Sequence, residues 1–268
     1  MQLSPLARTL LRIAAWFGLA LLYLPLVVVA ALSFGRSRSF AWPPTGFTFH
    51  WWAQAWQNHG ARDALLTSIR LALTAALVAL VLGTLLAFAL SRFTFFGRTA
   101  LSFAVVLPIA LPGIVTGIAM NSGFRQLGVH LGFVTLVVAH ATFCVVIVYN
   151  NVVARLRRLS GSLEEASSDL GAGTFQTFRY VTFPLVRSAL LAGGLLAVAL
   201  SFDEIVVTTF TSGATGQTLP QWMFDNLARP NQLPVVNVVA TAVVVLSIIP
   251  VWLAQRLTAG DPSGLAGR

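Results

Sequence analysis

The sequence is dominated by six long apolar runs, each far longer than a strand of a soluble protein. About 20 consecutive apolar residues are needed to cross the hydrocarbon core of a bilayer. Only helices or closed barrels can do so without leaving backbone groups unpaired. Each run has helix-like continuity, so the pattern predicts an all-α, polytopic membrane protein with six transmembrane helices. The runs cover residues 13–34, 71–90, 99–120, 131–153, 188–210 and 233–254.

The composition agrees with a membrane environment. Only 9% of the residues are charged and 57% are hydrophobic, whereas about a quarter of the residues in a soluble domain are charged. The first run follows Arg8 and Arg12, as the core of a signal peptide would, but its 22 uncharged residues exceed the usual core of about 7–15 residues. We expect an uncleaved first span and a single membrane domain over residues 1–268, with no attached soluble domain.

The arginines predict the orientation of the chain. All 17 basic residues are arginine, and an N-terminus in the cytoplasm would place 11 of them inside and 6 outside or at the outer boundary. This bias favours both termini in the cytoplasm. The same topology accounts for the net charge of +9 without any binding of nucleic acid. The inner arginines are Arg8, Arg12, Arg92, Arg98, Arg155, Arg157, Arg158, Arg179, Arg187, Arg256 and Arg268.

The predicted topology leaves two external loops, at residues 35–67 and 211–232. The first contains the turn cluster "WPPTG" and a stretch at 50–57 that predicts a short helix on the outer leaflet. Its tryptophans fit an interfacial belt; together with Trp222 they could instead form a cage around an amine. The tryptophans of the first loop are Trp42, Trp51, Trp52 and Trp56.

A single cysteine, Cys144, excludes an internal disulfide and a cysteine-based metal cluster. His140 lies four residues earlier, so the two side chains share one helix face. A thiol–imidazole catalyst would need a third polar group, and none accompanies them in the sequence. We therefore interpret the pair as packed side chains and expect neither a catalytic residue nor a metal site.

The internal loop at 154–187 is more polar than its surroundings. Ser162 stands three residues before Glu165, which predicts a capping box for a short helix. Gly171 and Gly173 predict its end and a sharp bend. A second short helix is expected from Thr174, with Pro184 marking a boundary before the next span. Two short helices projecting into the cytoplasm, with exposed aromatic side chains, are typical of a surface that docks into a partner.

This loop resembles the EAA loop of ABC importer permeases. In that family the loop reads Glu-Ala-Ala, three residues, Gly, nine residues, Ile, any residue, Leu-Pro. The spacing here is the same, and the departures, Ala to Ser, Ile to Val and Leu to Phe, have similar or tolerable shapes. The matching residues are Glu165, Ala166, Ser167, Gly171, Val181, Phe183 and Pro184.

The resemblance extends along almost the whole chain. "SFDEIVVTTFTSG" and "RPNQLPVVNVVAT" are similar to the second permease subunit of spermidine/putrescine importers. This implies a type I importer fold in a bacterial inner membrane, with the loop forming coupling helices. The implied partners are a second, homologous permease, two ATP-binding subunits that hold ATP and Mg, and a periplasmic or lipid-anchored solute-binding protein. The chain has no lysine, so it lacks a Walker phosphate loop, and no cofactor is expected on it.

Two acids in the fifth run are candidates for the substrate path. Asp203 and Glu204 lie roughly 23 Å above the cytoplasmic start of that run, where an ionised carboxylate costs at least about 2.5–3.5 kcal/mol. On one continuous helix, Ser201, Glu204 and Thr208 would form a polar stripe, with Asp203 about 100° away. Such a stripe suits a cationic amine. The acids could instead pair with groups of the partner permease.

The third run contains "LPIALPGIVTG". Pro108, Pro112 and Gly113 interrupt helical hydrogen bonding there. These residues are candidates for a hinge or a cavity wall, and a static packing kink is equally compatible with them.

We expect the chain to form the translocation path for a small cationic solute, most simply a polyamine such as putrescine or spermidine. Two alternatives stay open. The same permease could carry another solute, such as an amino acid, an opine or a GABA-like compound. A self-sufficient secondary transporter fits less well, because six spans without an inverted repeat and a docking loop both indicate a multisubunit system.

Overall fold

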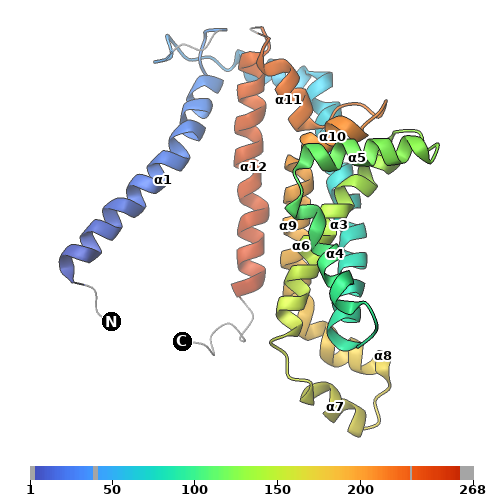
Figure 1. Cartoon of the computed structure of the whole chain (residues 1–268). Helices are drawn as coiled ribbons and strands as arrows, with labels where there is room; N and C mark the ends of the chain where they lie inside the picture. The colour runs from blue at the N-terminus through green and yellow to red at the C-terminus, as the bar shows by residue number, and fades with distance from the viewer. Residues whose placement is uncertain (1–3, 39–41, 230, 260–268) are drawn as a thin grey trace. The chain divides into compact units, whose positions relative to one another are not determined.

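The computed structural model describes residues 4–38, 42–229 and 231–259. Throughout this described part, the regular secondary structure is helical (Figure 1), apart from one isolated antiparallel bridge between Gly35 and Phe47. The elements are α1 (Pro5–Ser33), α2 (His50–Gln57), α3 (His59–Arg92), α4 (Arg98–Ala110), α5 (Gly113–Gln126), α6 (Phe133–Leu156), α7 (Ser162–Asp169), α8 (Thr174–Thr177), a π-helix (Phe178–Thr182), α9 (Phe183–Asp203), α10 (Val206–Thr211), α11 (Leu219–Leu227) and α12 (Leu233–Ala259). The predicted all-α class is therefore confirmed.

The chain divides into two compact units. The first contains Met1–Arg62 and Met223–Ile249, and the second contains Asp63–Trp222 and Pro250–Arg268. Each unit is described by itself.

The first unit contains α1, α2, most of α12 and the segment between α1 and α2. The helix predicted at 50–57 is present as α2. Trp51 is buried, and its indole Nε1 donates a hydrogen bond to the carbonyl of Gly35 at 2.9 Å. Phe34 stacks on Trp52 with ring centroids 5.2 Å apart. These two tryptophans therefore hold the segment together by internal contacts, rather than only anchoring it at an interface.

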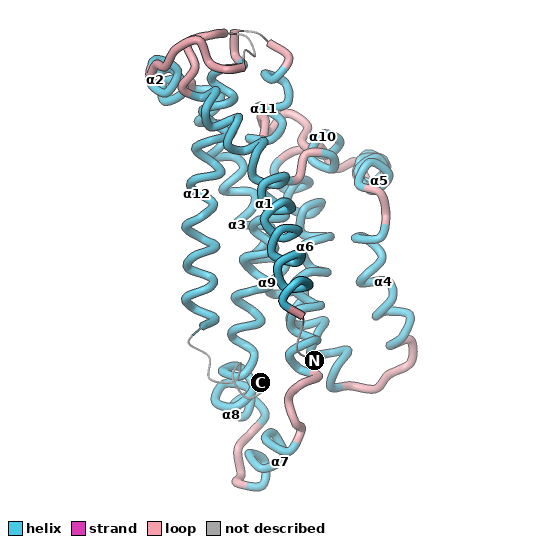
Figure 2. Tube along the Cα trace, turned by 90° about the vertical axis from the view of Figure 1, so that its left-hand side faces the viewer, coloured by secondary structure: helices cyan, strands magenta, loops and turns pink. Residues whose placement is uncertain are grey.

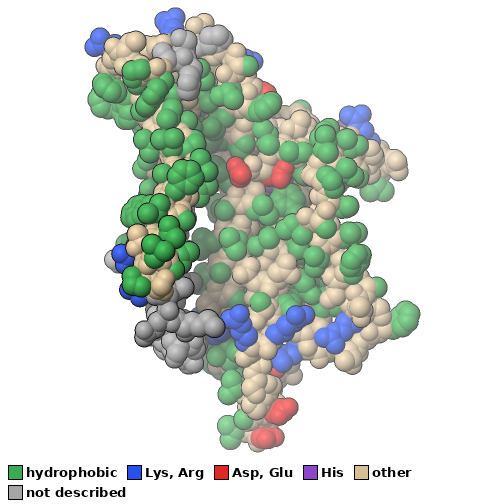
Figure 3. All heavy atoms as spheres, turned by 60° about the vertical axis from the view of Figure 1, so that its left-hand side comes forward, with side chains coloured by type: hydrophobic (Ala, Val, Ile, Leu, Met, Phe, Trp, Pro, Cys, Tyr) green, Lys and Arg blue, Asp and Glu red, His purple; other side chains and the backbone are tan. Residues whose placement is uncertain are grey.

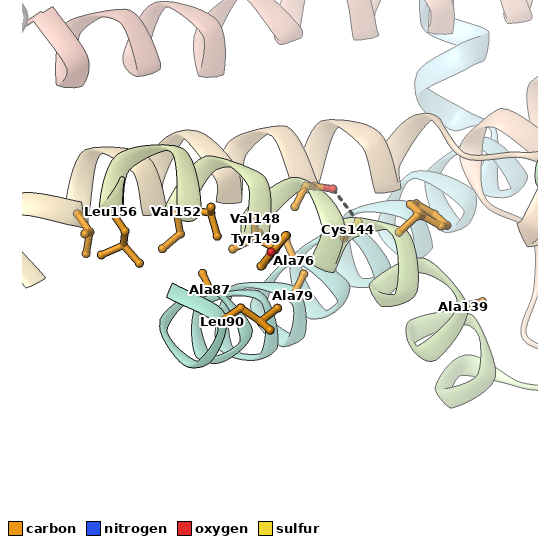
Figure 4. Close-up of a cluster of buried hydrophobic side chains, with 14 of the residues drawn as sticks. Ala76, Ala79, Ala87, Leu90, Ala139, Cys144, Val148, Tyr149, Val152 and Leu156 are labelled. Carbon is orange, nitrogen blue, oxygen red and sulfur yellow. Dashed lines mark hydrogen bonds between the residues drawn. The ribbon is translucent and has the colours of Figure 1, made fainter. Parts of the chain in front are cut away.

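The second unit is built on the packing of α3, α6 and α9, which run side by side (Figures 1 and 2). Small residues on α3, labelled in Figure 4, let this helix approach α6 closely. Gly83 shows how close the approach is, because an added Cβ would lie 2.9 Å from the carbonyl oxygen of Val145. Cys144 is buried in the same cluster and its thiol points to the carbonyl of Ala197 at 3.4 Å. The buried small residues in the second half of α3 and just before that half include Ala72, Ala75, Ala76, Ala79 and Ala87.

Among the described residues, four helices are long and apolar enough to span a membrane, and a bent helix pair brings this number up to five. The four are α1, α3, α6 and the continuous segment Thr174–Asp203. The helix α12 runs from Leu233 to Ala259, and its apolar stretch Leu233–Ile249 is not among the four. The predicted count of six spans is therefore not confirmed.

The third apolar run is not one straight helix, and it breaks where Pro112 and Gly113 predicted an interruption. It is divided into α4 and α5, which meet at an angle of 110°. Leu111 is extended, with φ −85° and ψ 143°. Proline disfavours the helical conformation in the residue before it, so Pro112 explains why the break falls there. Pro108, by contrast, is accommodated within α4.

The fifth run also differs from the predicted single helix, at both ends. Its helix ends at Asp203, and Glu204 is extended, with ψ 118°, before α10 begins at Val206. At the other end, α8 continues through the π-helix into α9 without a break, and Pro184, in the first turn of α9, marks a change of helix type rather than a new helix. A proline leaves one helical carbonyl without its usual donor. The wider turn of the π-helix, closed by Phe183 N–H on the carbonyl of Phe178, accommodates this change in hydrogen bonding.

Candidate functional site

The segment that resembles the EAA loop lies at one end of the second unit, beyond the ends of α6 and α9 (Figures 1 and 2). The helix α7 begins at Ser162 with Gly161 as its N-cap and has no side-chain capping hydrogen bond, so the predicted capping box between Ser162 and Glu165 is wrong. The loop after it turns at Gly171, where φ is +83°. An added Cβ at Gly171 would meet nothing within 4 Å, so the left-handed backbone is what favours glycine there.

The second part of the loop also differs from the prediction. Gly173, rather than Thr174, is the N-cap of α8, and its N–H donates to Oε1 of Gln176 at 3.0 Å. Because α8 runs on into α9, only α7 is a separate short helix.

Polar contacts hold α7 against the rest of the unit. The carboxylate oxygen Oε1 of Glu164 accepts a hydrogen bond from the Arg92 guanidinium at 2.8 Å and another from the Thr182 hydroxyl at 2.9 Å. The hydroxyls of Ser167 and Thr177 are 3.0 Å apart and link α7 to α8. Glu164, which the sequence analysis did not single out, therefore fixes the loop to both α3 and the π-helix. Arg92 lies 72 residues away, so no local pattern could have indicated this contact.

The opposite side of the loop is open. Glu165 and Ala166 are exposed, and three apolar side chains beside them, Leu163, Leu170 and Phe175, are 48–90% exposed. We refer to these five residues as the docking surface. Phe178 and Phe183 contact each other, and Phe178 packs edge-on against Phe88 of α3. The aromatic side chains that were predicted to be exposed in this segment are therefore divided: Phe175 belongs to the docking surface, whereas Phe178 packs against the rest of the unit.

A second polar site surrounds the break between α9 and α10. The imidazole of His140 is fully buried, and its two nitrogens contact hydroxyls on either side of the break. Nδ1 lies 2.8 Å from Ser201 Oγ and Nε2 lies 2.9 Å from Thr208 Oγ1. The Thr208 hydroxyl also donates to the carbonyl of Glu204 at 2.7 Å. His140 is thus a packed side chain, as expected, with a specific role in joining α9 to α10.

The three residues of the predicted polar stripe, and Asp203 beside it, are arranged in a different way. Ser201 and Thr208 meet on His140, but the helix between them is interrupted, so the stripe as drawn on one continuous helix is wrong. Glu204 is half-buried, and its Oε1 accepts the backbone N–H of Val207 at 2.8 Å, capping α10. Asp203 is exposed at the end of α9. The break therefore gives two adjacent acids different surroundings.

The bend at Pro112 and Gly113 lays α5 against α10. An added Cβ on Gly113 would lie 3.6 Å from Val206, and one on Gly117 would lie 2.7 Å from the ring of Phe210. The Asn121 side-chain amide donates to the carbonyl of Phe210. The residues Gly113, Gly117 and Asn121 recur every four positions, so they form one face of α5 that fits α10. The sequence analysis identified only the first of them.

Comparisons with known proteins agree with these features. Residues 79–260 match the family described as the binding-protein-dependent transport system inner membrane component. The chain is 34% identical over 255 residues to the spermidine/putrescine transport system permease protein PotC of Haemophilus influenzae, covering 94% of this chain and 98% of the relative. It is 32% identical over 251 residues to the putrescine transport system permease protein PotI of Escherichia coli K12, covering 89% and 88%.

The fold is similar to that of a solved transporter. A crystal structure of a bacterial ABC transporter involved in the import of the acidic polysaccharide alginate superposes with a TM-score of 0.71. The match covers 97% of this chain and 98% of that one, at 18% identity. The fold and the sequence match together lead to one conclusion: the chain belongs to the family of inner-membrane components of binding-protein-dependent transport systems, as a permease subunit of an ABC importer.

Proposed function

We propose that the docking surface couples this permease to a separate ATP-binding subunit. The observation that carries the proposal is the two-sided character of α7. Glu164 and Ser167 hold its inner side through hydrogen bonds, while Glu165, Ala166 and their apolar neighbours stay exposed. A rigidly held, exposed apolar surface with one acid is suited to a groove in a partner. Gly171, Val181, Phe183 and Pro184 would shape the segment around it.

The expected assembly contains this chain, a second homologous permease, two ATP-binding subunits and a solute-binding protein that is periplasmic or lipid-anchored. ATP and Mg would reside on the ATP-binding subunits. Both termini of this chain would lie in the cytoplasm, on the same side as the docking surface. The arginine bias supports this orientation.

The substrate we propose is a small cationic amine of the polyamine class. Two observations support it: the two relatives are named for spermidine and putrescine transport, and two carboxylates lie at the break between α9 and α10. Asp203 is exposed and Glu204 has a second carboxylate oxygen beyond the one that caps α10. A carboxylate forms strong charge-assisted hydrogen bonds with ammonium groups. Ser201 and Thr208 would position the acids, and Pro112 and Gly113 would set the wall opposite them.

The test is ATP hydrolysis by the complete importer reconstituted in proteoliposomes, with the binding protein loaded in turn with putrescine, spermidine, an amino acid and an opine. Stimulation of ATP hydrolysis by either polyamine supports the proposed substrate class. Stimulation only by another solute contradicts it and leaves the coupling role intact.

Coupling is tested separately with Glu165→Arg and, as its matched control, Glu164→Gln. Glu165→Arg is expected to lower stimulated ATP hydrolysis at least about tenfold, because one repulsive charge in a docked interface costs several kcal/mol. Glu164→Gln retains an acceptor on the inner side and is expected to lose less than about threefold. Normal stimulation in Glu165→Arg would contradict the docking surface.

A further inference from the structure

A small pocket of about 260 Å³ lies where α3, α4 and α6 meet, within the second unit. The end of α3, the start of α4 and the end of α6 each contribute side chains to its wall. Its apolar floor belongs to the buried cluster, of which Leu90, Tyr149 and Leu156 are labelled in Figure 4. Three arginines line it, one from each helix end: Arg92, Arg98 and Arg157.

The pocket carries excess positive charge. No aspartate or glutamate is among the residues that line it. Arg92 is paired with Glu164, which stands just outside, at 2.8 Å. Three guanidinium groups against one neighbouring carboxylate leave a local charge of +2. In the space-filling view, basic side chains form a band directly above the acidic side chains at the lower end of the molecule (Figure 3).

Capping of helix ends explains only part of this charge. Arg98 Nε donates to the carbonyl of Leu90 at 2.8 Å and so caps α3, which leaves the two terminal nitrogens of its guanidinium. Arg157 is exposed, and in the described part of the chain no carboxylate lies within 4 Å of it or of Arg98. The preference of arginine for the cytoplasmic side would place these residues near the cytoplasmic boundary of the membrane. That preference does not require them to converge on one pocket.

The start of α4 adds to the positive electrostatic potential of the pocket. Arg98 is the first residue of this 13-residue helix, which has no side-chain cap on its first amides and no acid in its first turn. The N-terminus of a helix favours an anion. Ser102, one turn later, and Tyr149 place their hydroxyl oxygens 3.0 Å apart in the pocket wall. One hydroxyl hydrogen is used between them, so the pair offers one further hydrogen-bond donor for an oxyanion.

We propose that this pocket binds a phosphate group, held by Arg98 and Arg157 and, beside its ion pair, by Arg92. Guanidinium groups bind phosphate oxygens in pairs of parallel hydrogen bonds. The volume is slightly below the range of about 300–1,000 Å³ of sites for drug-sized ligands. It fits a phosphate with a few attached atoms rather than a nucleotide. Two sources have this chemistry: the headgroup of an anionic phospholipid, and free phosphate or a small phosphate ester in the cytoplasm.

The experiment uses the full chain in nanodiscs of phosphatidylcholine alone or with one fifth phosphatidylglycerol. Thermal unfolding is followed in each, with inorganic phosphate titrated against chloride at constant ionic strength. Native mass spectrometry measures how much phosphatidylglycerol stays bound. Stabilisation by inorganic phosphate in phosphatidylcholine assigns the site to free phosphate. Retention of phosphatidylglycerol without a response to inorganic phosphate assigns it to the lipid headgroup. The absence of both responses would overturn the proposal.

Arg157→Gln is the test variant, and Arg158→Gln is its matched control, because Arg158 is exposed and does not line the pocket. Loss of one charge-assisted contact is expected to weaken binding about tenfold in Arg157→Gln and to leave Arg158→Gln within about twofold. Equal effects of the two variants would show a general surface attraction and overturn the site. If Arg157→Gln fails to fold, the second variant is Tyr149→Phe, which removes one hydroxyl from the pocket wall. This variant is expected to weaken binding about threefold. Unchanged binding would overturn the site.

Discussion

His140 shows how one side chain can determine the course of a backbone. Its two nitrogens contact Ser201 and Thr208, which lie 61 and 68 residues away in the sequence. Since all three residues are buried, an unpaired hydroxyl or imidazole nitrogen would have no water to replace its partner. The sequence indicated that His140 would pack, because it is isolated in an apolar run. Which residues it contacts depends on tertiary structure and left no local signal.

We predict that His140→Ala lowers the free energy of unfolding by about 1–3 kcal/mol, because it leaves the buried Ser201 hydroxyl without its imidazole partner and removes one of the two partners of the Thr208 hydroxyl. Thermal unfolding of the detergent-solubilised importer measures the change. Thr142→Ala is the control, since the Thr142 hydroxyl bonds only to Val138 of its own helix. Equal melting temperatures for His140→Ala and Thr142→Ala would show that the bridge contributes nothing to stability.

Glu204 has two separable properties, its charge and its capping hydrogen bond to Val207. We predict that Glu204→Gln, which keeps an acceptor oxygen, folds normally and raises the substrate concentration for half-maximal polyamine uptake about tenfold. Glu204→Ala loses the cap as well and is expected to lower the free energy of unfolding by about 0.5–2 kcal/mol. Transport assays and thermal unfolding of both variants distinguish the two effects. Unchanged uptake in Glu204→Gln would leave this residue a structural role only.

At the scale of elements, the helices and breaks that depend on neighbouring residues were predictable from local sequence patterns. The sequence predicted a short helix at 50–57, and α2 has these bounds. Pro112 and Gly113 predicted an interruption, and α4 and α5 part there. The end of α9 at Asp203 was not predictable in this way, because its apolar continuation favours a helix and the His140 contacts that bridge the break come from another helix. Likewise, the motif directed attention to Glu165, while its neighbour Glu164 makes the contacts that hold the loop.

The fit of α5 on α10 gives an element-scale prediction. Gly117→Ala is expected to destabilise the protein by about 1–3 kcal/mol, because the new methyl group would lie 2.7 Å from the Phe210 ring. Gly123→Ala is the control in the same helix, with open space around it, and should change stability by less than about 1 kcal/mol, in the favourable direction. Thermal unfolding compares the two. Equal effects would mean that α5 does not pack on α10 as described.

At the scale of the whole molecule, topology remains a prediction from the arginine bias, and the single buried cysteine makes it measurable. In a Cys144→Ala background, we predict that Ala214→Cys reacts with a membrane-impermeant maleimide in intact cells. Ser168→Cys, on the docking surface helix, should react only after the inner membrane is made permeable. Both positions are exposed. Labelling of Ser168→Cys in intact cells would place the coupling loop on the wrong side of the membrane.

The continuity of α8, the π-helix and α9 has a mechanical consequence. The 30 residues of Thr174–Asp203 form one uninterrupted helical segment, and its α9 part, Phe183–Asp203, is about 32 Å long at 1.5 Å per residue. The segment begins within the docking surface, and its far end carries Ser201, which His140 ties to α10. A stiff helix of the length of α9 acts as a lever: a tilt of about 5° at its base moves its far end by about 3 Å. A small tilt of α9 would therefore move Asp203 and the adjoining Glu204 by about the length of a hydrogen bond.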